Sequence, residues 1–214
     1  MKVYLSFDIG ITNLAFVKAQ VNVEENQIIS VLQAECVNIS ELRHKRVSRE
    51  SCQLHHSRDV YDKIQHFLQE YAPMFAEVDH ILIERQPLGG LVHVEQLLYG
   101  QFRSKARLVS PNAMHKHYEI NDLNYEGRKE ETTRMAAPYL EGVVADWNEK
   151  ERLHDMADAL CLLRYTLFRD HLEWKTQQHY QAKVIEAKVK VNAQEISVEN
   201  FFEQFRHQKN GGRK

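Results

Sequence analysis

Two short apolar runs that each end in a carboxylate are the features that most constrain this chain. Residues 3–7 (VYLSF) lead into Asp8 and then Gly10, and residues 81–83 (ILI) lead into Glu84. Short runs rich in β-branched and aromatic residues, closed by turn residues, predict strands. We therefore expect two buried strands, each with an acid at its end.

The patterns along the rest of the chain predict an α/β protein. Two further strands, which would form an antiparallel meander with the first, are expected at 14–17 and 27–34, and a short one at 106–109. Apolar residues at helical spacing predict helices at 60–71, 91–102, from Pro111, 126–140 and 152–174. Strands followed by alternating helices and strands are typical of a mixed sheet with flanking helices.

The charge of the chain is unevenly distributed. The 214 residues have a net charge of −2, which by itself gives no hint of a nucleic-acid partner. Residues 175–214, however, are basic, and the body before them is acidic. We expect a main domain over 1–174 and a basic C-terminal extension over 175–214. Within the extension, partial alternation predicts an extra strand at 184–191, followed by a short helix at 198–205 and a frayed end at 210–214.

The cysteines and the N-terminus predict a soluble intracellular protein. Cys36, Cys52 and Cys161 are far apart and form no CxxC pair, so neither a disulfide framework nor a structural zinc site is expected. The first residues reach Asp8 without forming a signal peptide, and no apolar run is as long as a membrane span.

Four acids stand where a strand ends or where a helix face turns toward the core. Asp155 and Asp158 are three residues apart at the start of a helix, hence on one face, among apolar neighbours. With Asp8 and Glu84 they would form a cluster that needs a hard divalent cation, for which Mg²⁺ or Mn²⁺ fits oxygen ligands best. Each acid alone has a simpler explanation as a turn cap, a surface acid or a charge that favours the helix dipole.

The motifs resemble those of the RuvC-like Holliday junction resolvases of large DNA viruses, the poxvirus and iridovirus type, within the RNase H-like superfamily. The matching segments are 5–15 (LSFDIGITNLA), 81–86 (ILIERQ) and 154–160 (HDMADAL), over about residues 2–170. The resemblance implies an RNase H-like five-stranded sheet and a Mg²⁺-dependent endodeoxyribonuclease that uses two ions, with Mn²⁺ as a possible substitute. It assigns metal binding and catalysis to Asp8, Glu84, Asp155 and Asp158.

The resemblance also implies a basic residue on the helix before the last one, which assists at the scissile phosphate. Arg128 and Lys129 match that place, and we choose Lys129 as the catalytic residue, because a cation there stabilises the transferring phosphoryl group. The simpler explanation is a solvated lysine paired with Glu130 or Glu131.

A junction resolvase must contact many phosphates, and basic residues supply those contacts. Residues 96–118 contain no Asp or Glu, and residues 41–58 form another basic segment. The DNA-binding candidates are Arg85, Arg103, Lys105, Arg107, Lys116 and Arg128. An apolar wedge beside the active site, Leu88 or Leu91, would open base pairs.

By resemblance, two subunits form a C2 homodimer that cuts opposite strands of four-way branched DNA. Helices 60–71 and 91–102 are candidate dimer contacts, and the first is more plausible as ordinary core. No membrane partner is expected. We expect the cleavage activity to be intracellular, at the site of viral DNA replication if the source is a virus.

Three alternatives stay open. The first is an RNase H-like nuclease for flaps, hybrids or other branched DNA. The second is an actin or sugar-kinase type nucleotide-binding enzyme, whose first phosphate motif resembles residues 8–13; a length of 214 residues with eight glycines argues against it. The third is a DNA-binding module without catalysis, against which the presence of all four acids argues.

Overall fold

The computed structural model describes residues 1–10, 12–40, 59–145, 147 and 152–210, with side chains at 187 and 191–210 left out. The predicted basic stretch at 41–58 and the last four residues of the predicted frayed end lie outside the described residues. The chain divides into two compact units, Met1–His171 and Leu172–Lys214.

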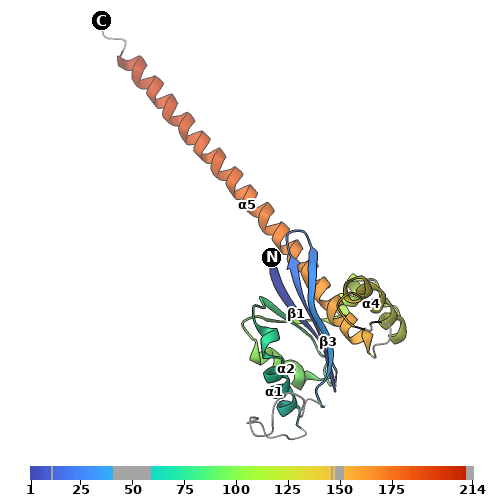
Figure 1. Ribbon diagram of the computed structural model, residues 1–214. Coiled ribbons are helices and arrows are strands. Elements are labelled where there is room, and N and C mark those ends of the chain that lie inside the picture. Colours follow the sequence, from blue (N-terminus) through green and yellow to red (C-terminus); the bar gives the residue numbers. More distant parts are fainter. Residues whose placement is uncertain (11, 41–58, 146, 148–151, 211–214) are drawn as a thin grey trace. The chain divides into compact units, whose positions relative to one another are not determined.

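The first unit is built on a five-stranded mixed sheet in the order β3-β2-β1-β4-β5 (Figure 1). Its strands are β1 (Lys2–Ile9), β2 (Asn13–Asn22), β3 (Gln27–Asn38), β4 (His80–Glu84) and β5 (Ala106–Val109). The first three strands form the predicted antiparallel meander, whereas β4 is parallel to both β1 and β5. The predicted mixed sheet is thus confirmed, although β2 and β3 extend further than the apolar patterns indicated.

Helices cover both faces of this sheet. The elements are α1 (Val60–Glu70), the 3-10 helix η1 (Ala72–Phe75), α2 (Val92–Gln101), α3 (Pro111–His117), α4 (Tyr125–Leu140) and α5 (Leu153–Asn210). One core lies between the sheet and α1 with α2, and the other between the sheet and α3, α4 and the start of α5 (Figure 1). The predicted dimer candidates α1 and α2 therefore both contribute buried residues to the core.

The alternation of side chains along β1 decides which core each residue joins. Leu5 and Phe7 pack toward α1 and α2, whereas Tyr4 packs into the core with α4 and α5. Since successive side chains of a strand point to opposite faces, Asp8 shares the α5 face with Tyr4. The same alternation along β4, with Leu82 on the α5 face, directs Glu84 to that side as well.

Gly10 closes the turn between β1 and β2. Its N–H donates to the Asn13 carbonyl oxygen at 2.9 Å, and a Cβ at this position would lie 2.6 Å from that oxygen. Only glycine allows this approach, because any side chain would collide with backbone. The glycine therefore serves the hairpin that fixes Asp8 at the end of its strand.

The predictions for the tail were wrong. The expected strand at 184–191 and the separate helix at 198–205 both belong to α5, which runs without interruption to Asn210. Residues 153–210 contain neither Gly nor Pro, so nothing in this stretch stops the helix that the core nucleates. The β-branched residues Val184, Val189 and Val191 suggested a strand, but their cost in helix propensity is small. Among the described helices, none combines the length and apolar character needed to cross a membrane.

Candidate active site

Asp8 and Glu84 meet at the carboxyl ends of two neighbouring parallel strands. The register pairs Phe7 of β1 with Ile83 of β4, so the next residue of each strand is an acid on the α5 side. Burial, together with the nearby charges of Glu84 and Asp158, raises the pKa of Asp8 well above its ordinary value. Asp8 is therefore a buried acid whose ionised form is disfavoured by burial and by the neighbouring acids.

Asp155 and Asp158 approach from the first turns of α5. Asp155 is 6% exposed and accepts from Arg152 Nε at 2.6 Å, and His154 Nε2 lies 3.1 Å from its other oxygen. The Cys36 thiol also donates to Asp155, at 3.7 Å, and burial raises the pKa of that thiol to about 12. The buried carboxylate is thus held by groups from β3, from Arg152 just before α5 and from the first turn of α5 itself.

Lys129 on α4 is the predicted basic residue, and its ammonium group forms an ion pair with Asp158. Burial lowers the pKa of Lys129, but Asp158 and Asp8 more than offset this, so that the pKa is raised overall. The helix that presents it begins at Asn124, whose side chain caps the Gly127 N–H at 2.8 Å. The structure therefore joins Lys129 to the acid cluster and not to Glu130 or Glu131.

Gln86 connects Glu84 to a second, buried acid that the sequence did not reveal. Its Nε2 donates to Glu84 Oε2 at 2.7 Å, and the same oxygen accepts from the Ile9 N–H at 3.3 Å. The backbone N–H of Gln86 donates to Glu95 of α2 at 2.6 Å, and Glu95 is 3% exposed. Burial raises the pKa of Glu84, and the donors at Ile9 and Gln86 act in the opposite direction.

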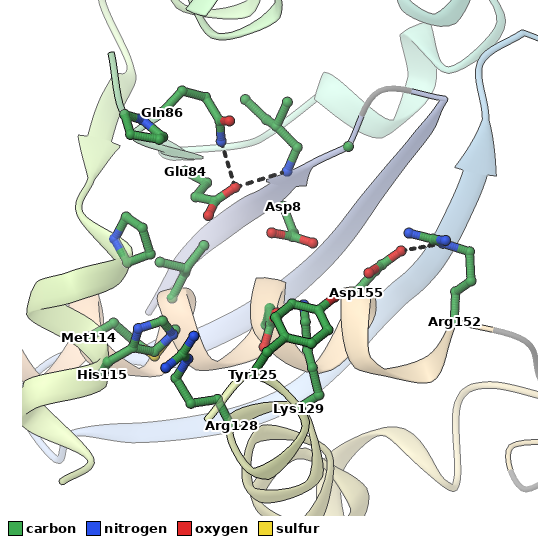
Figure 2. A pocket seen from close by; sticks show the side chains of 16 residues that line it. Asp8, Glu84, Gln86, Met114, His115, Tyr125, Arg128, Lys129, Arg152 and Asp155 are labelled. Atoms are coloured by element: carbon green, nitrogen blue, oxygen red, sulfur yellow. Dashed lines mark hydrogen bonds and ion pairs between the residues drawn. The ribbon is translucent and has the colours of Figure 1, made fainter. Parts of the chain in front are cut away.

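All four acids line one cavity of about 390 Å³. Figure 2 labels three of them, Asp8, Glu84 and Asp155. Among the described residues, the permanent cations in its lining are Arg128, Lys129 and Arg152. As the side chains stand, no three His, Cys, Asp or Glu residues within the described ranges lie close enough together to hold one metal ion. Two of the four acids are engaged instead by Lys129 and Arg152.

The predicted DNA-binding residues lie in different places. Arg128 lines the cavity and donates to the Leu123 carbonyl oxygen at 2.5 Å. Lys116 is exposed on α3, while Arg85 and Arg103 are exposed in the connections that flank α2.

Lys105 and Arg107, like Arg128, are bonded within the protein. Lys105 donates to the Val78 carbonyl oxygen at 2.8 Å. Arg107 forms two bonds to Asp170, at 2.8 and 2.6 Å, and Asp170 also accepts from Tyr4. Asp170 is twelve residues beyond Asp158 on α5, which is about 18 Å along the helix axis. The Arg107 guanidinium is therefore engaged at a distance from the acid cluster.

Arg152 is the neighbour of the acids that sequence reasoning missed most clearly. It has a left-handed backbone, with φ of 60°, immediately before α5. The spacing of three residues between Arg152 and Asp155 is the only feature of the sequence that indicates this ion pair. Because it precedes the helix, the rule for pairs on one helix face does not apply to it.

Comparison with known proteins identifies the family. The model of the family described as poxvirus A22 protein matches residues 2–169. The chain belongs to this family. The predicted resemblance to the resolvases of large DNA viruses is thereby confirmed. No curated protein matches the sequence.

Solved structures share the fold of the first unit. The fowlpox virus resolvase, in complex with Holliday junction DNA, is 16% identical over 77% of this chain and 96% of its own, with a TM-score of 0.54. The yeast mitochondrial Holliday junction resolvase is 17% identical over 84% of each chain, with a TM-score of 0.58. At these identities the likeness establishes the fold, and the predicted RNase H-like resolvase fold is confirmed.

Proposed function

We propose that this protein is a Holliday junction resolvase, a metal-dependent endodeoxyribonuclease that cuts four-way DNA junctions. The observation that supports this most directly is the gathering of Asp8, Glu84, Asp155 and Asp158 with Lys129 around one cavity. Family membership and the folds of two named resolvases support the same activity. The substrates would be the branched intermediates of recombination and replication, and the place of action the intracellular site of viral DNA replication.

The chemistry of the donor set suits a hard divalent cation, and binding would require Asp158 and Asp155 to exchange their ion pairs with Lys129 and Arg152 for the metal. All four acids offer oxygen, which Mg²⁺ and Mn²⁺ prefer, and burial, followed by the nearby charges of Glu84 and Asp158, raises the pKa of Asp8. We propose that Asp8, Glu84, Asp155 and Asp158 hold two Mg²⁺ ions, for which Mn²⁺ can substitute. Bound there, such ions lower the pKa of water and stabilise charge on the phosphate oxygens.

The residues of the chain would then position the scissile phosphate. Lys129 and Arg128 lie on one helix at the wall of the cavity and would donate to phosphate oxygens as negative charge develops on them. Glu84 is held in place by Gln86 and the Ile9 N–H, so its orientation is fixed before DNA arrives. Hydrolysis would leave a 5′-phosphate and a 3′-hydroxyl.

Junction selectivity would come from a homodimer and from the loop after β4. Leu88 stands fully exposed in that loop, while Leu91 packs against the core with α1 and α2. Leu88 is therefore the better candidate for a wedge that opens base pairs. Two subunits related by a C2 axis would each cut one of two opposite strands.

A cleavage assay with synthetic DNA tests the proposal. The purified protein with Mg²⁺ or Mn²⁺ is expected to cut a four-way junction in preference to a flap, an RNA–DNA hybrid and a linear duplex. Asp8→Asn and Glu84→Gln should abolish cleavage, whereas Glu130→Gln, at an exposed acid beside Lys129, should retain it.

Three outcomes would count against the proposal. Absence of cleavage by the wild-type protein with either metal would overturn it, as would undiminished cleavage by the Asp8 and Glu84 variants. Equal cutting of flaps or hybrids would instead favour the broader RNase H-like nuclease.

A further inference from the structure

The second unit of the chain lies beyond what the family match explains. The match ends at residue 169, and the fowlpox resolvase is covered over 96% of its length by only 77% of this chain. The described residues of this unit, 172–210, all belong to α5. Thirty-nine helical residues thus follow the nuclease unit without an assigned role.

Apolar residues along this helix repeat every seven positions. Val184, Val191, Val198 and Phe205 form one series at that spacing. A second series, Tyr180, Ala187, Gln194 and Phe201, precedes each of them by four residues. Alternating steps of four and three are the heptad pattern of a coiled coil, with the first series at the a positions and the second at the d positions.

Within residues 172–210, α5 is the one element that the structure describes in this unit. The described part of the unit is a single helix, and Tyr180 is 69% exposed on it. A lone helix gains little stability in water from propensity alone, and its apolar seam is stabilised by burial against a partner. The unit therefore presents one half of an interface.

We propose that residues 180–208 of α5 form a parallel two-stranded coiled coil with a second copy of this chain. Valine occupies three of the four a positions, where β-branched side chains suit the packing of parallel dimers. Gln194 interrupts the apolar series once, and in a parallel pair it falls opposite its own copy, which penalises shifted registers.

The opposite face of the helix is a weaker candidate. Ile185, Val189 and Ile196 form a shorter apolar row there, and the corresponding later positions are Asn200 and Glu203. That row spans about three turns, whereas the heptad series continues to Phe205. The two faces make different predictions at residues 189 and 191, and this difference provides the test.

The consequence for catalysis rests on the proposed function, but the pairing itself does not. A coiled coil would join two nuclease units in one molecule, so that the second arrives at a high effective concentration once the first has bound a junction. Pairing can be measured without DNA and without metal. Failure of the resolvase proposal would therefore leave the pairing result standing, and the reverse also holds.

Cysteine cross-linking of the full-length chain tests directly which residues lie at the seam. Val191→Cys is expected to form a disulfide-linked dimer under mild oxidation. Val189→Cys, two residues away and 61% exposed, should remain monomeric on a non-reducing gel. The unmodified chain, with Cys36, Cys52 and Cys161, shows the background. Cross-linking at 189 and not at 191 would overturn the proposal, as would cross-linking at neither position.

A second pair of variants measures how much the seam contributes. Val191→Asp places two like charges in the core of the paired helices and should raise the dissociation constant about 100-fold, measured by light scattering over a concentration series. Val189→Asp has the same cost in helix propensity and should leave the constant unchanged. Circular dichroism of both variants checks that α5 still forms. Equal dissociation constants for the two variants would refute the assigned seam.

Discussion

Replacing Gln86 with Ala should slow cleavage and shift its acidic limb to higher pH. The substitution removes the donor that lies 2.7 Å from Glu84 Oε2 and leaves that oxygen with the Ile9 N–H at 3.3 Å. A hydrogen bond to a charged group contributes about 1.5–3 kcal/mol, so the rate should fall about 10- to 150-fold.

The direction of the pH effect follows from which form of Glu84 the bond favours. Burial raises the pKa of Glu84, and the Gln86 donor holds it down by stabilising the carboxylate. Without the donor the pKa rises further, so the ionised form is lost at a higher pH than in the wild-type protein. Gln86→Glu, which adds a negative charge beside Glu84, should shift the limb further in the same direction.

Gln96→Ala is the matched control for this experiment. The side-chain amide of Gln96 donates to Glu95 Oε1 at 2.7 Å, so this bond also joins an amide to a carboxylate. Gln96 is exposed on α2, a helix that carries none of the four clustered acids. Rates of junction cleavage measured from pH 5 to 9 under single-turnover conditions would separate the two variants. A Gln86→Ala enzyme with wild-type rate and profile would refute the view that this amide fixes Glu84.

Three further substitutions test other parts of the structure. Lys129→Met should lower the cleavage rate 100-fold or more, since a charge that stabilises the reacting phosphate typically contributes about 2.7–4 kcal/mol, while Lys63→Met on the opposite face of the sheet should have no effect. Leu88→Ala should reduce cleavage of intact junctions and leave the melting temperature of the protein unchanged. Leu32→Ala, at an exposed residue of β3, controls for the loss of an apolar surface group. Equal junction cleavage by the two variants would contradict a wedge at Leu88. Ser6 has a buried hydroxyl with no hydrogen-bond partner among the described residues, so Ser6→Ala should keep or raise the free energy of unfolding by up to about 1 kcal/mol in a denaturant titration; a loss would reveal a partner.

The part of the site that lies on regular elements was predictable from the sequence. Asp8 and Glu84 follow directly from strand runs, and parallel pairing of those strands brings their ends together. Asp155 and Asp158 share a helix face because of their spacing. Lys129 was assigned by its place in a family pattern; the structure pairs it with Asp158, and its catalytic role stays a prediction.

The part that depends on turns and long-range pairs was not predictable. Arg152 reaches Asp155 from a left-handed residue that no periodic pattern announces. Glu95 is an acid in an amphipathic helix, and only the fold shows that it is buried against the Gln86 backbone. Arg107 belongs to a basic run in the sequence, yet its partner Asp170 lies 63 residues further along.

The tail shows why local propensity misleads when a helix is extended from a stable core. The β-branched residues over 184–191 favour a strand in isolation. A helix that already runs from Leu153 needs no new nucleation at residue 184. Adding each further residue then depends only on the free energy of helix propagation, which is small. The spacing of seven between Val184, Val191 and Val198 is the stronger signal, because a strand would require a period of two.

The charges that line the cavity indicate the order in which substrate and cation must be accommodated. Its four carboxylates face three permanent cations, and His115 adds little charge near neutral pH because burial lowers its pKa. A phosphodiester that entered this cavity alone would bring a further negative charge toward Asp8, whose ionised form is already disfavoured by burial and by the neighbouring acids. Productive binding at the acids therefore requires added positive charge, whereas contacts outside the cavity, such as those of the exposed Lys116, do not. DNA affinity measured without a divalent cation should thus come from the surface contacts and be opposed by the carboxylates of the cavity. Asp8→Asn should therefore raise that affinity, and not lower it, at a pH at which Asp8 of the wild-type protein is ionised.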